Sequence, residues 1–437
     1  IDATTGTEKW AYIPPQVMPN MWRLADSGYG NTGGHRYYVD GTPTVGDVKN
    51  SAGVWKTVLV GGFGAGGKGF YALDVTDPSA PKSLWNICTD ATLCNVVDAG
   101  MGLSFGQPII TRVTKGATTK WVVLVSSGHN NSNGIGYLYV LDAMTGAILS
   151  KISTGVGTAS APSGLTKMSA WTDNADKENL STWVYAGDLL GNVWRFDLRD
   201  LDAVSVIKLA ELKDPSGNPQ AVTTEPELGE INSKRVIYVG TGKLISASDL
   251  TTTQVQTVYA IKDDNVSATL PTIRDATASG TFVQQVMSNV TISGVVSRDV
   301  ASPEVVDWDT KNGWYVDLTV GTATGERVSV DMSLDLGTLS VVTNTPKTGV
   351  CIAGGESWIY YFDFKAGKNV VTGTSTTPYV GKKLADALGT RPVIVRLPNG
   401  KIVSIIRLTN NTTLTQDVPI ATSVSAGRRI NWRELLD

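Results

Sequence analysis

Histidine and cysteine are scarce in this sequence of 437 residues, which contains two of the former and three of the latter. Zinc sites are built mostly from these two residue types at short spacing, and the sequence offers no such cluster. His35 and His129 lie in the Gly/Asn-rich stretches GGHRYY and SGHNNSNG, and no nucleophile motif such as G-x-S-x-G accompanies them. We therefore interpret both as structural hydrogen-bonding residues and predict no catalytic residues and no enzyme activity.

Long runs of one charge sign and long apolar runs are also missing. The formal net charge is -3, with acids and bases scattered along the chain, which gives no reason to expect nucleic acid or an anionic membrane as a partner. No apolar run approaches the roughly 18 residues that a transmembrane helix needs. The first residues, IDATTGTEKW, lack the pattern of a signal peptide, so we expect a mature or trimmed portion of a longer protein.

Two of the three cysteines bracket a short loop, CTDATLC, from Cys88 to Cys94. We predict a local disulfide between them, which implies an oxidising compartment such as the periplasm or the cell exterior. Two free thiols in a reduced protein are the alternative. Cys351 is left over, either as a buried thiol or as a partner for a cysteine elsewhere.

What the sequence has in abundance is one repeated phrase. Apolar and aromatic residues lead into an acidic or basic residue and then a turn, as expected for a half-buried strand that enters a hairpin. A second apolar run precedes most copies, and we interpret each pair of runs as the two inner strands of one sheet. The phrase occurs at 70–78, 137–146, 192–200, 257–264 and 358–367, with a degenerate copy at 313–321, and the preceding runs lie at 56–62, 120–128, 182–188 and 235–243.

Recurrence at irregular intervals of roughly 45–70 residues is typical of four-stranded blades with loop insertions. We therefore predict an all-β fold, a β-propeller of about seven blades with irregular loop insertions, and treat 1–437 as a single propeller domain. A β-sandwich array would not explain the repetition. Helical signal is sparse: 382–389 is the best candidate, and 198–232 is a second.

The first copy, IDATTGTEKWAYIP at 1–14, begins where the others are half finished. Either the strands expected at 391–410 close the ring against it, or upstream residues are missing. We expect an additional N-terminal domain in the complete protein.

Several stretches carry a family resemblance. The phrase YVLDAMTG resembles the blade motif of quinoprotein dehydrogenase propellers, in which Trp and Gly support packing between blades. This resemblance implies that the predicted β-propeller is a modified quinoprotein-like one. A longer set resembles the C-terminal region of the PilC/PilY family of type IV pilus tip-associated adhesins, over nearly the whole chain: GHRYYVDGTPTVGDV, WKTVLVGGFGAGGKGFYALDVTDP, FGQPII, VYAGDLLGNVWRFDL, YVGTGKLI, GWYVDL with GERV, CIAGGESWIYYFD and GRRINWREL.

This resemblance implies a secreted protein of a Gram-negative bacterium, located at the pilus tip, the outer membrane surface or the periplasm. It implies a role in pilus biogenesis by opposing retraction, in twitching motility and in adhesion. The implied partners are minor pilins or other pilus-tip components, host or abiotic surfaces, and the upstream N-terminal domain of the same protein.

One polar loop is a candidate calcium site. Asp173, Asn174, Asp176 and Glu178 supply the hard oxygen ligands that calcium prefers. The family resemblance implies a calcium loop similar to an EF-hand loop here, with Asn174, Asp176, Glu178, the Leu180 carbonyl and Thr182 as ligands. Thr182 replaces the usual closing carboxylate and the central Gly is absent, so weakened or lost affinity is expected. A solvated polar turn is the alternative.

Three other features are interpreted as architectural. The Gly-rich stretch at 61–69 lacks the order of a phosphate-binding loop and is predicted to connect the second and third strands of a blade. The recurring carboxylates are predicted to cap turns, and the tryptophans nearest the phrase to pack between blades. These residues are Asp74, Asp142, Asp197 and Asp363, and Trp10, Trp85 and Trp194.

Two alternative functions remain open at this stage. A quinone-dependent periplasmic dehydrogenase would share the repeat but would require cofactor-stacking residues and calcium ligands that the sequence does not concentrate. An outer-membrane assembly scaffold would share the repeat but not the pilus-specific stretches.

Overall fold

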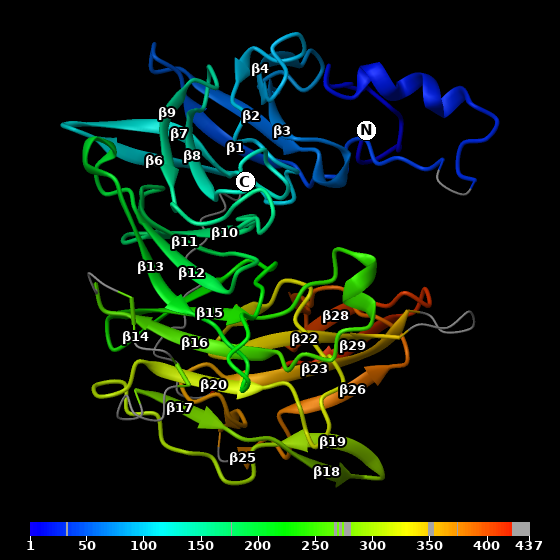
Figure 1. The fold of residues 1–437 in the computed structure, drawn as a ribbon, viewed down its shortest axis with the longest axis vertical. Coiled ribbons are helices and arrows are strands. Elements are labelled where there is room, and N and C mark those ends of the chain that lie inside the picture. The colour runs from blue at the N-terminus through cyan, green and yellow to red at the C-terminus, as the bar shows by residue number, and fades with distance from the viewer. Residues whose placement is uncertain are drawn as a thin grey trace. The chain divides into compact units, whose positions relative to one another are not determined.

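The computed structural model describes residues 1–31, 34–175, 177–265, 269–270, 273–274, 281–347, 354–373 and 375–421. Nearly all regular elements in these ranges are β-strands (Figure 1). The helical elements among the described residues are four short 3-10 helices: η1 (Met18–Ala25), η2 (Gly64–Gly66), η3 (Leu201–Ala203) and η4 (Ala247–Leu250). None of the helices in the described ranges is long and apolar enough to cross a bilayer.

The chain divides into two compact units. Unit 1 contains Ile1–Val184 and Phe196–Val206, and unit 2 contains Tyr185–Arg195 and Ile207–Asp437. The division falls within three strands of one sheet, and each unit is described below by itself.

Unit 1 contains two sheets in which consecutive strands are neighbours. Their inner strands pair antiparallel, for example from Val58↔Asp74 to Gly62↔Phe70. The first sheet consists of β1 (Thr44–Lys49), β2 (Trp55–Gly62), β3 (Gly69–Asp74), β4 (Lys82–Cys88) and β5 (Val96–Val97), and the second of β6 (Ile109–Lys115), β7 (Thr118–Ser126), β8 (Tyr137–Asp142) and β9 (Ile148–Ser153). Apolar side chains of both sheets, among them Val60, Phe70 and Tyr139, share one buried cluster.

A third sheet carries the segment where the units divide. It consists of β10 (Met168–Thr172), β11 (Ser181–Gly187), β12 (Asn192–Asp197) and β13 (Ser205–Glu211), in that order.

Unit 2 adds sheets in which neighbours are not always consecutive along the chain. One has the order β14 (Glu227–Ile231), β15 (Lys234–Gly240), β16 (Thr257–Asp263), β20 (Gly313–Asp317), β17 (Phe282–Gln285), and the next has the order β18 (Ser288–Ile292), β19 (Val295–Asp299), β26 (Gly381–Ala385), β23 (Gly355–Asp363), β22 (Thr338–Pro346), β21 (Ser333–Asp335). A three-stranded sheet contains β27 (Val393–Arg396), β28 (Ile402–Arg407) and β29 (Thr413–Asp417), and β24 (Val371–Thr372) pairs with β25 (Ser375–Thr376).

The repeated phrase forms strands, as predicted, but their burial differs from the prediction. β3, β8 and β12 are buried at five consecutive positions and reach partial exposure only at the final Asp. Such strands are covered on both faces, so their side chains do not alternate between core and solvent. The prediction of half-buried strands was therefore wrong, because neighbouring elements pack against both faces.

The helix prediction for 382–389 was also wrong. This stretch contains β26, which pairs with β19 and with β23. The second helical candidate, 198–232, contains η3, β13 and part of β14. Strand pairing with neighbouring elements overrode the local helical pattern in both places.

Candidate functional site

The recurring carboxylates of the repeated phrase cap turns, as predicted. Each accepts a hydrogen bond through Oδ1 from the backbone N–H two residues later, at 3.0 Å for Asp74, Asp142, Asp197 and Asp363. Asp263 ends β16 in the same way, with the N–H of Asn265 at 3.1 Å. Because these carboxylates hold local turns, their recurrence reflects architecture.

Two tryptophans dock on the turn of the neighbouring sheet. The Trp85 indole N–H donates to the carbonyl of Ala143 at 2.9 Å, and the ring leaves no space for a side chain at Gly146. Trp314 repeats this arrangement in unit 2, with its N–H on the carbonyl of Phe364 at 3.1 Å and its ring against Gly367. In the copies at 137–146 and 358–367, the final Gly therefore receives a tryptophan from the preceding sheet, in agreement with the predicted packing role of Trp85.

Trp194 contacts a turn of its own sheet instead. Its indole N–H donates to Asp188 Oδ2 at 2.9 Å, and the same buried carboxylate accepts from the backbone N–H groups of Leu190 and Asn192. The Trp10 indole N–H donates to the carbonyl of Pro78, and its partly buried ring packs against an apolar cluster that contains Phe63, Tyr71 and Leu73.

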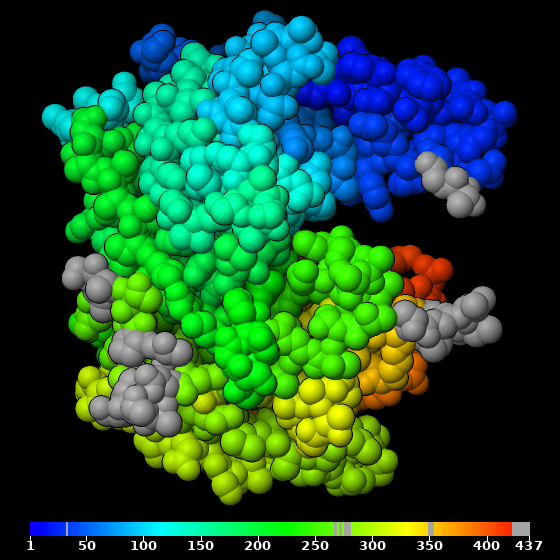
Figure 2. Space-filling model, viewed as in Figure 1, coloured from blue at the N-terminus to red at the C-terminus, as the bar shows by residue number. Residues whose placement is uncertain are grey.

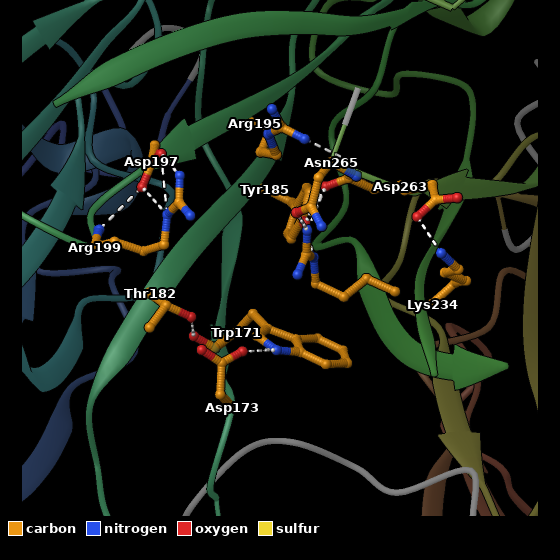
Figure 3. Close-up of polar contacts among 12 residues, drawn as sticks. Trp171, Asp173, Thr182, Tyr185, Arg195, Asp197, Arg199, Lys234, Asp263 and Asn265 are labelled. Carbon is orange, nitrogen blue, oxygen red and sulfur yellow. Dashed lines mark hydrogen bonds and ion pairs between the residues drawn. The ribbon is translucent and has the colours of Figure 1, made fainter. Parts of the chain in front are cut away.

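The candidate calcium loop connects β10 to β11. Asp173 is exposed and accepts a hydrogen bond from the Trp171 indole at 2.8 Å, as Figure 3 shows. Asn174 is exposed, and its carbonyl accepts from the N–H groups of Lys177 and Glu178 at 2.9 and 3.0 Å. The loop therefore begins with two polar side chains at the surface, and two backbone hydrogen bonds to Asn174 follow. Asp176 lies outside the described residues.

The second half of the loop is anchored to β6. The Glu178 carboxylate lies 3.8 Å from the Arg112 guanidinium, and the Arg112 N–H donates to the carbonyl of Asn179 at 2.9 Å. Leu180 and Arg112 form an isolated parallel β-bridge. Thr182 is already part of β11, and its hydroxyl donates to the carbonyl of Trp171 at 3.4 Å.

The predicted ligands therefore belong to two local environments. Asp173 and Asn174 are exposed at the start of the loop, whereas Glu178 and Thr182 contact protein groups. Across the described residues, which exclude Asp176, no group of three or more His, Cys, Asp or Glu side chains is close enough to hold a metal ion.

Beside the loop, Arg199 binds Asp197 through two parallel hydrogen bonds, from Nε at 3.0 Å and from Nη2 at 2.6 Å (Figure 3). The hydrogen bond to Asp197 raises the pKa of Arg199. The guanidinium also stacks over the Trp183 ring, 4.4 Å from its centroid. This arrangement fixes the end of the phrase at 192–200.

In unit 2, a buried charge network joins four strands and was not predicted from the sequence. Asp263 of β16 accepts from Arg195 of β12 and from Tyr185 of β11, both at 2.6 Å, and Arg235 of β15 donates to the Tyr185 hydroxyl at 2.8 Å (Figure 3). Burial, followed by the charge of Asp263, raises the pKa of Tyr185 well above its ordinary value. The Asp263 carboxylate is paired with arginines of neighbouring strands, so we interpret this network as structural, because it holds the strands together.

The GERV stretch contributes a second buried network in unit 2. Glu326 accepts hydrogen bonds from Arg298, Tyr360 and Thr343, each at 2.6 Å. The Arg298 guanidinium stacks over Trp358, 4.1 Å from the ring centroid.

The two histidines do not form an acid and base pair with a nucleophile. His129 is buried, packs against Phe105, and its Nδ1 has no hydrogen-bond partner in the described structure. Burial lowers its pKa to about 4. The predicted hydrogen-bonding role is therefore not met at this atom, and the residue is a neutral packing group. His35 is exposed between Tyr29 and Tyr37.

The Gly-rich stretch at 61–69 joins β2 to β3, the second and third strands of their sheet, as predicted. A side chain at Gly66 would lie 1.9 Å from the carbonyl oxygen of Tyr38, and one at Gly41 would lie 2.5 Å from that of Gly62. The glycines are thus explained by close backbone approach to the segment before β1.

The structure contains the predicted disulfide between Cys88 and Cys94. Asn86 supports the loop, since its Nδ2 donates to the carbonyl of Leu93 at 3.0 Å and its Oδ1 accepts from the N–H of Asn95 at 2.8 Å. Cys351 lies outside the described residues.

Comparison with known protein families identifies residues 2–299 as matching the family described as the PilY1 β-propeller domain. Among curated proteins, the type IV pilus biogenesis factor PilY1 of Pseudomonas aeruginosa strain PAO1 is 33% identical over 397 residues, covering 82% of this chain and 33% of that protein. A PilY1 homologue of Xylella fastidiosa is 29% identical over 460 residues, covering 100% of this chain and 34% of the relative. The chain thus spans about a third of the length of these relatives.

Among solved structures, the crystal structure of the Pseudomonas aeruginosa PilY1 C-terminal domain superimposes with a TM-score of 0.72 and 27% sequence identity. The match covers 94% of this chain and 89% of that one. Together with the repeated sheets, it shows a β-propeller fold of the predicted class. The number of blades, about seven, stays a prediction.

Proposed function

The chain belongs to the PilY1 β-propeller family, and on this basis we propose that it serves type IV pilus biogenesis as a non-enzymatic component of the pilus tip. The observation that carries the proposal is the family match over residues 2–299, supported by structural similarity to a PilY1 C-terminal domain over 94% of the chain. The role follows from the names of the related proteins, which are type IV pilus biogenesis factors.

A non-enzymatic role agrees with how the polar groups are used. The phrase-ending carboxylates bind backbone turns, and two buried networks pair carboxylates with arginines and tyrosines. These groups serve folding contacts and are not arranged around a substrate. The proposal includes location at the pilus tip, the outer membrane surface or the periplasm, with minor pilins, surface ligands and an N-terminal domain of the same protein as partners.

The role in opposing retraction can be tested genetically in the source bacterium. The coding region of this chain is deleted within its gene, in the parent strain and in a strain that lacks the retraction ATPase. We expect the deletion to abolish sheared surface pilin and twitching motility in the parent, and pilin to return in the retraction-deficient strain. Unchanged pilin and motility in the parent deletion would argue against the proposal.

Adhesion is a separate part of the proposal and is measured on equally piliated cells. Retraction-deficient strains with and without the deletion are compared for attachment to epithelial cells and to glass. Reduced attachment at equal pilin levels supports a direct adhesive role, whereas equal attachment restricts the function to assembly.

We further infer that the loop from Asp173 to Thr182 binds calcium. Its support is the oxygen-rich donor set: the exposed Asp173 carboxylate and Asn174 amide, the partly exposed Glu178 carboxylate, the Leu180 carbonyl and the Thr182 hydroxyl, together with Asp176 from the sequence. Glu178 would exchange its contact with Arg112 for the ion. This exchange costs little, because an ion pair of 3.8 Å between partly exposed groups contributes at most about 1 kcal/mol.

Calcium titration by calorimetry tests the inference. The wild-type chain is compared with Asp176→Ala and with Glu230→Ala, a control that removes an exposed carboxylate from β14. We expect saturable binding at micromolar to millimolar calcium that is lost only in Asp176→Ala. Absence of binding heat in the wild-type chain would leave the loop as a solvated connection.

A further inference from the structure

β18 has a free hydrogen-bonding edge. It is the terminal strand of its sheet and pairs only with β19, in the register Ser288↔Asp299, Val290↔Ser297 and Ile292↔Val295. A two-residue turn, Ser293 and Gly294 with φ of 49° and 79°, closes the hairpin at Ile292 and Val295.

The register determines which backbone groups remain available. In an antiparallel hairpin, hydrogen-bonded and non-hydrogen-bonded pairs alternate from the closing pair, so Val290 exchanges hydrogen bonds with Ser297. The N–H and C=O groups of Asn289 and Thr291 therefore point away from β19. Within the described ranges they have no hydrogen-bond partner, and both residues are exposed. Four backbone hydrogen-bonding groups thus face outward along one short strand.

The sequence of β18, SNVTI, lacks the features that usually protect an edge strand. Native sheets discourage edge pairing with charged side chains, prolines or bulges. β18 contains no charged residue and no proline, and its pairing with β19 has no register shift. Three other terminal strands carry charges, namely Lys151 in β9, Lys208 in β13 and Asp417 in β29.

The hairpin extends beyond the rest of its sheet. β19 pairs with β26 only at Ser297 and Arg298, so the half nearest the turn is a two-stranded ribbon. Val295 and Val296 are 46% and 53% exposed. The hairpin atoms lie at the lower edge of Figure 2 with no other segment in front of them. A two-stranded ribbon is marginally stable in water and gains stability from a third strand.

We propose that β18 is a docking edge to which a pilus subunit adds an extended strand. The added strand exchanges backbone hydrogen bonds with Asn289 and Thr291 and places uncharged, β-branched side chains beside Val290 and Ile292. This assignment rests on the proposed role in pilus biogenesis and names the surface and the kind of partner that this role uses.

Photo-crosslinking in cells identifies the partner. Benzoylphenylalanine is placed at Thr291 of the full-length protein in the source bacterium, and at Thr415, an exposed position of the terminal strand β29, as the control. We expect irradiation to link position 291, and not position 415, to a pilus subunit identified by mass spectrometry. A link to a second copy of this chain, or no link to a pilus subunit, would overturn the proposal.

Proline substitution tests whether the backbone edge carries the contact. Asn289→Pro removes an N–H that the fold does not use, so the hairpin register with β19 is retained. Thr291→Lys adds a charge that discourages pairing of another strand with this edge and leaves the backbone groups in place. Thr415→Lys is its matched control. Asn289→Pro is measured with the photo-crosslinker at 291. Because Thr291→Lys occupies position 291, both lysine variants carry the crosslinker at Ser288. Their crosslinking yield is compared with that of a protein that carries the crosslinker at Ser288 and no other substitution.

Asn289→Pro and Thr291→Lys are each expected to lower the crosslinking yield at least tenfold, with melting temperatures near wild type, and Thr415→Lys to leave it unchanged. If Asn289→Pro is unstable, the crosslinking yield of Thr291→Lys alone tests the docking edge. Unchanged yield in a folded variant, together with loss of pili on deletion of the chain, would reject the docking edge but keep the proposed function. Normal piliation after deletion would reject the proposed function itself.

Discussion

His129 is a residue whose burial links the protein's stability to pH. Its pKa is about 4 in the folded protein and near 6.5 in an unfolded chain. Between these values the unfolded chain binds more protons, so stability falls as the pH is lowered through this window. The loss approaches about 3 kcal/mol below pH 4.

We therefore expect the melting temperature of the wild-type chain to fall more steeply between pH 6.5 and pH 4 than that of His129→Gln. His35→Gln, at the exposed histidine, serves as the control and should follow the wild type. Parallel curves for wild type and His129→Gln, measured by circular dichroism, would contradict the assigned burial effect.

Glycine 146 provides a second test, of tryptophan docking. Gly146 and Gly155 have the same φ of 70°, but an added Cβ would lie 2.7 Å from the Trp85 ring at Gly146 and would meet nothing within 4 Å at Gly155. Gly155→Ala should cost about 1 kcal/mol from backbone strain alone. Gly146→Ala should cost about 1–3 kcal/mol more, because the indole must move.

Thermal unfolding of the two variants gives the comparison directly. A clearly lower melting temperature for Gly146→Ala supports the docking of Trp85 on the turn after β8. Equal melting temperatures would mean that the ring contact contributes nothing beyond the backbone strain.

At the scale of elements, the sequence predicted the strands whose signal is local. The apolar runs before Asp74, Asp142 and Asp197 form β3, β8 and β12 at the expected positions, because each run is bounded by turn residues. The turn-capping role of these carboxylates was predictable for the same reason.

Elements defined by distant partners were not predictable. β26 has a helical pattern in isolation, yet its pairing with β19 and β23 makes it a strand. The Asp263 network was missed because Tyr185, Arg195 and Arg235 come from three other strands, and no sequence spacing marks their convergence. For the candidate calcium loop, the oxygen donors could be named from the sequence, whereas the contact between Glu178 and Arg112 depends on the neighbouring strand β6.

The contribution of the disulfide to stability can be tested by replacement of both cysteines. Cys88 and Cys94 close a loop after β4, with a sequence separation of 6. Cross-linking so short a loop stabilises the fold by about 2 kcal/mol in the chain-entropy description. We expect the double substitution Cys88→Ser with Cys94→Ser to lower the melting temperature and to remove its sensitivity to dithiothreitol. A wild-type protein that melts at the same temperature with and without reductant would contradict this expectation.

At the scale of the whole molecule, the account rests on a propeller whose repeated phrase serves packing. Asp caps the turn, Gly makes room for the tryptophan of the preceding sheet, and buried ion pairs join strands within unit 2. This use of the conspicuous residues leaves loops and strand edges as the surfaces for interaction. Under the proposed role in pilus biogenesis, these are the surfaces at which we expect pilus components to bind.

The central claim is that this chain acts in pilus biogenesis, and the most direct measurement is the number of surface pili per cell by electron microscopy. Cells that produce the full-length protein are compared with cells that produce the same protein without these 437 residues. The account predicts few or no pili in the second strain and recovery when the complete gene is restored on a plasmid. Equal pilus numbers in the two strains, with the shortened protein present at normal levels, would contradict it.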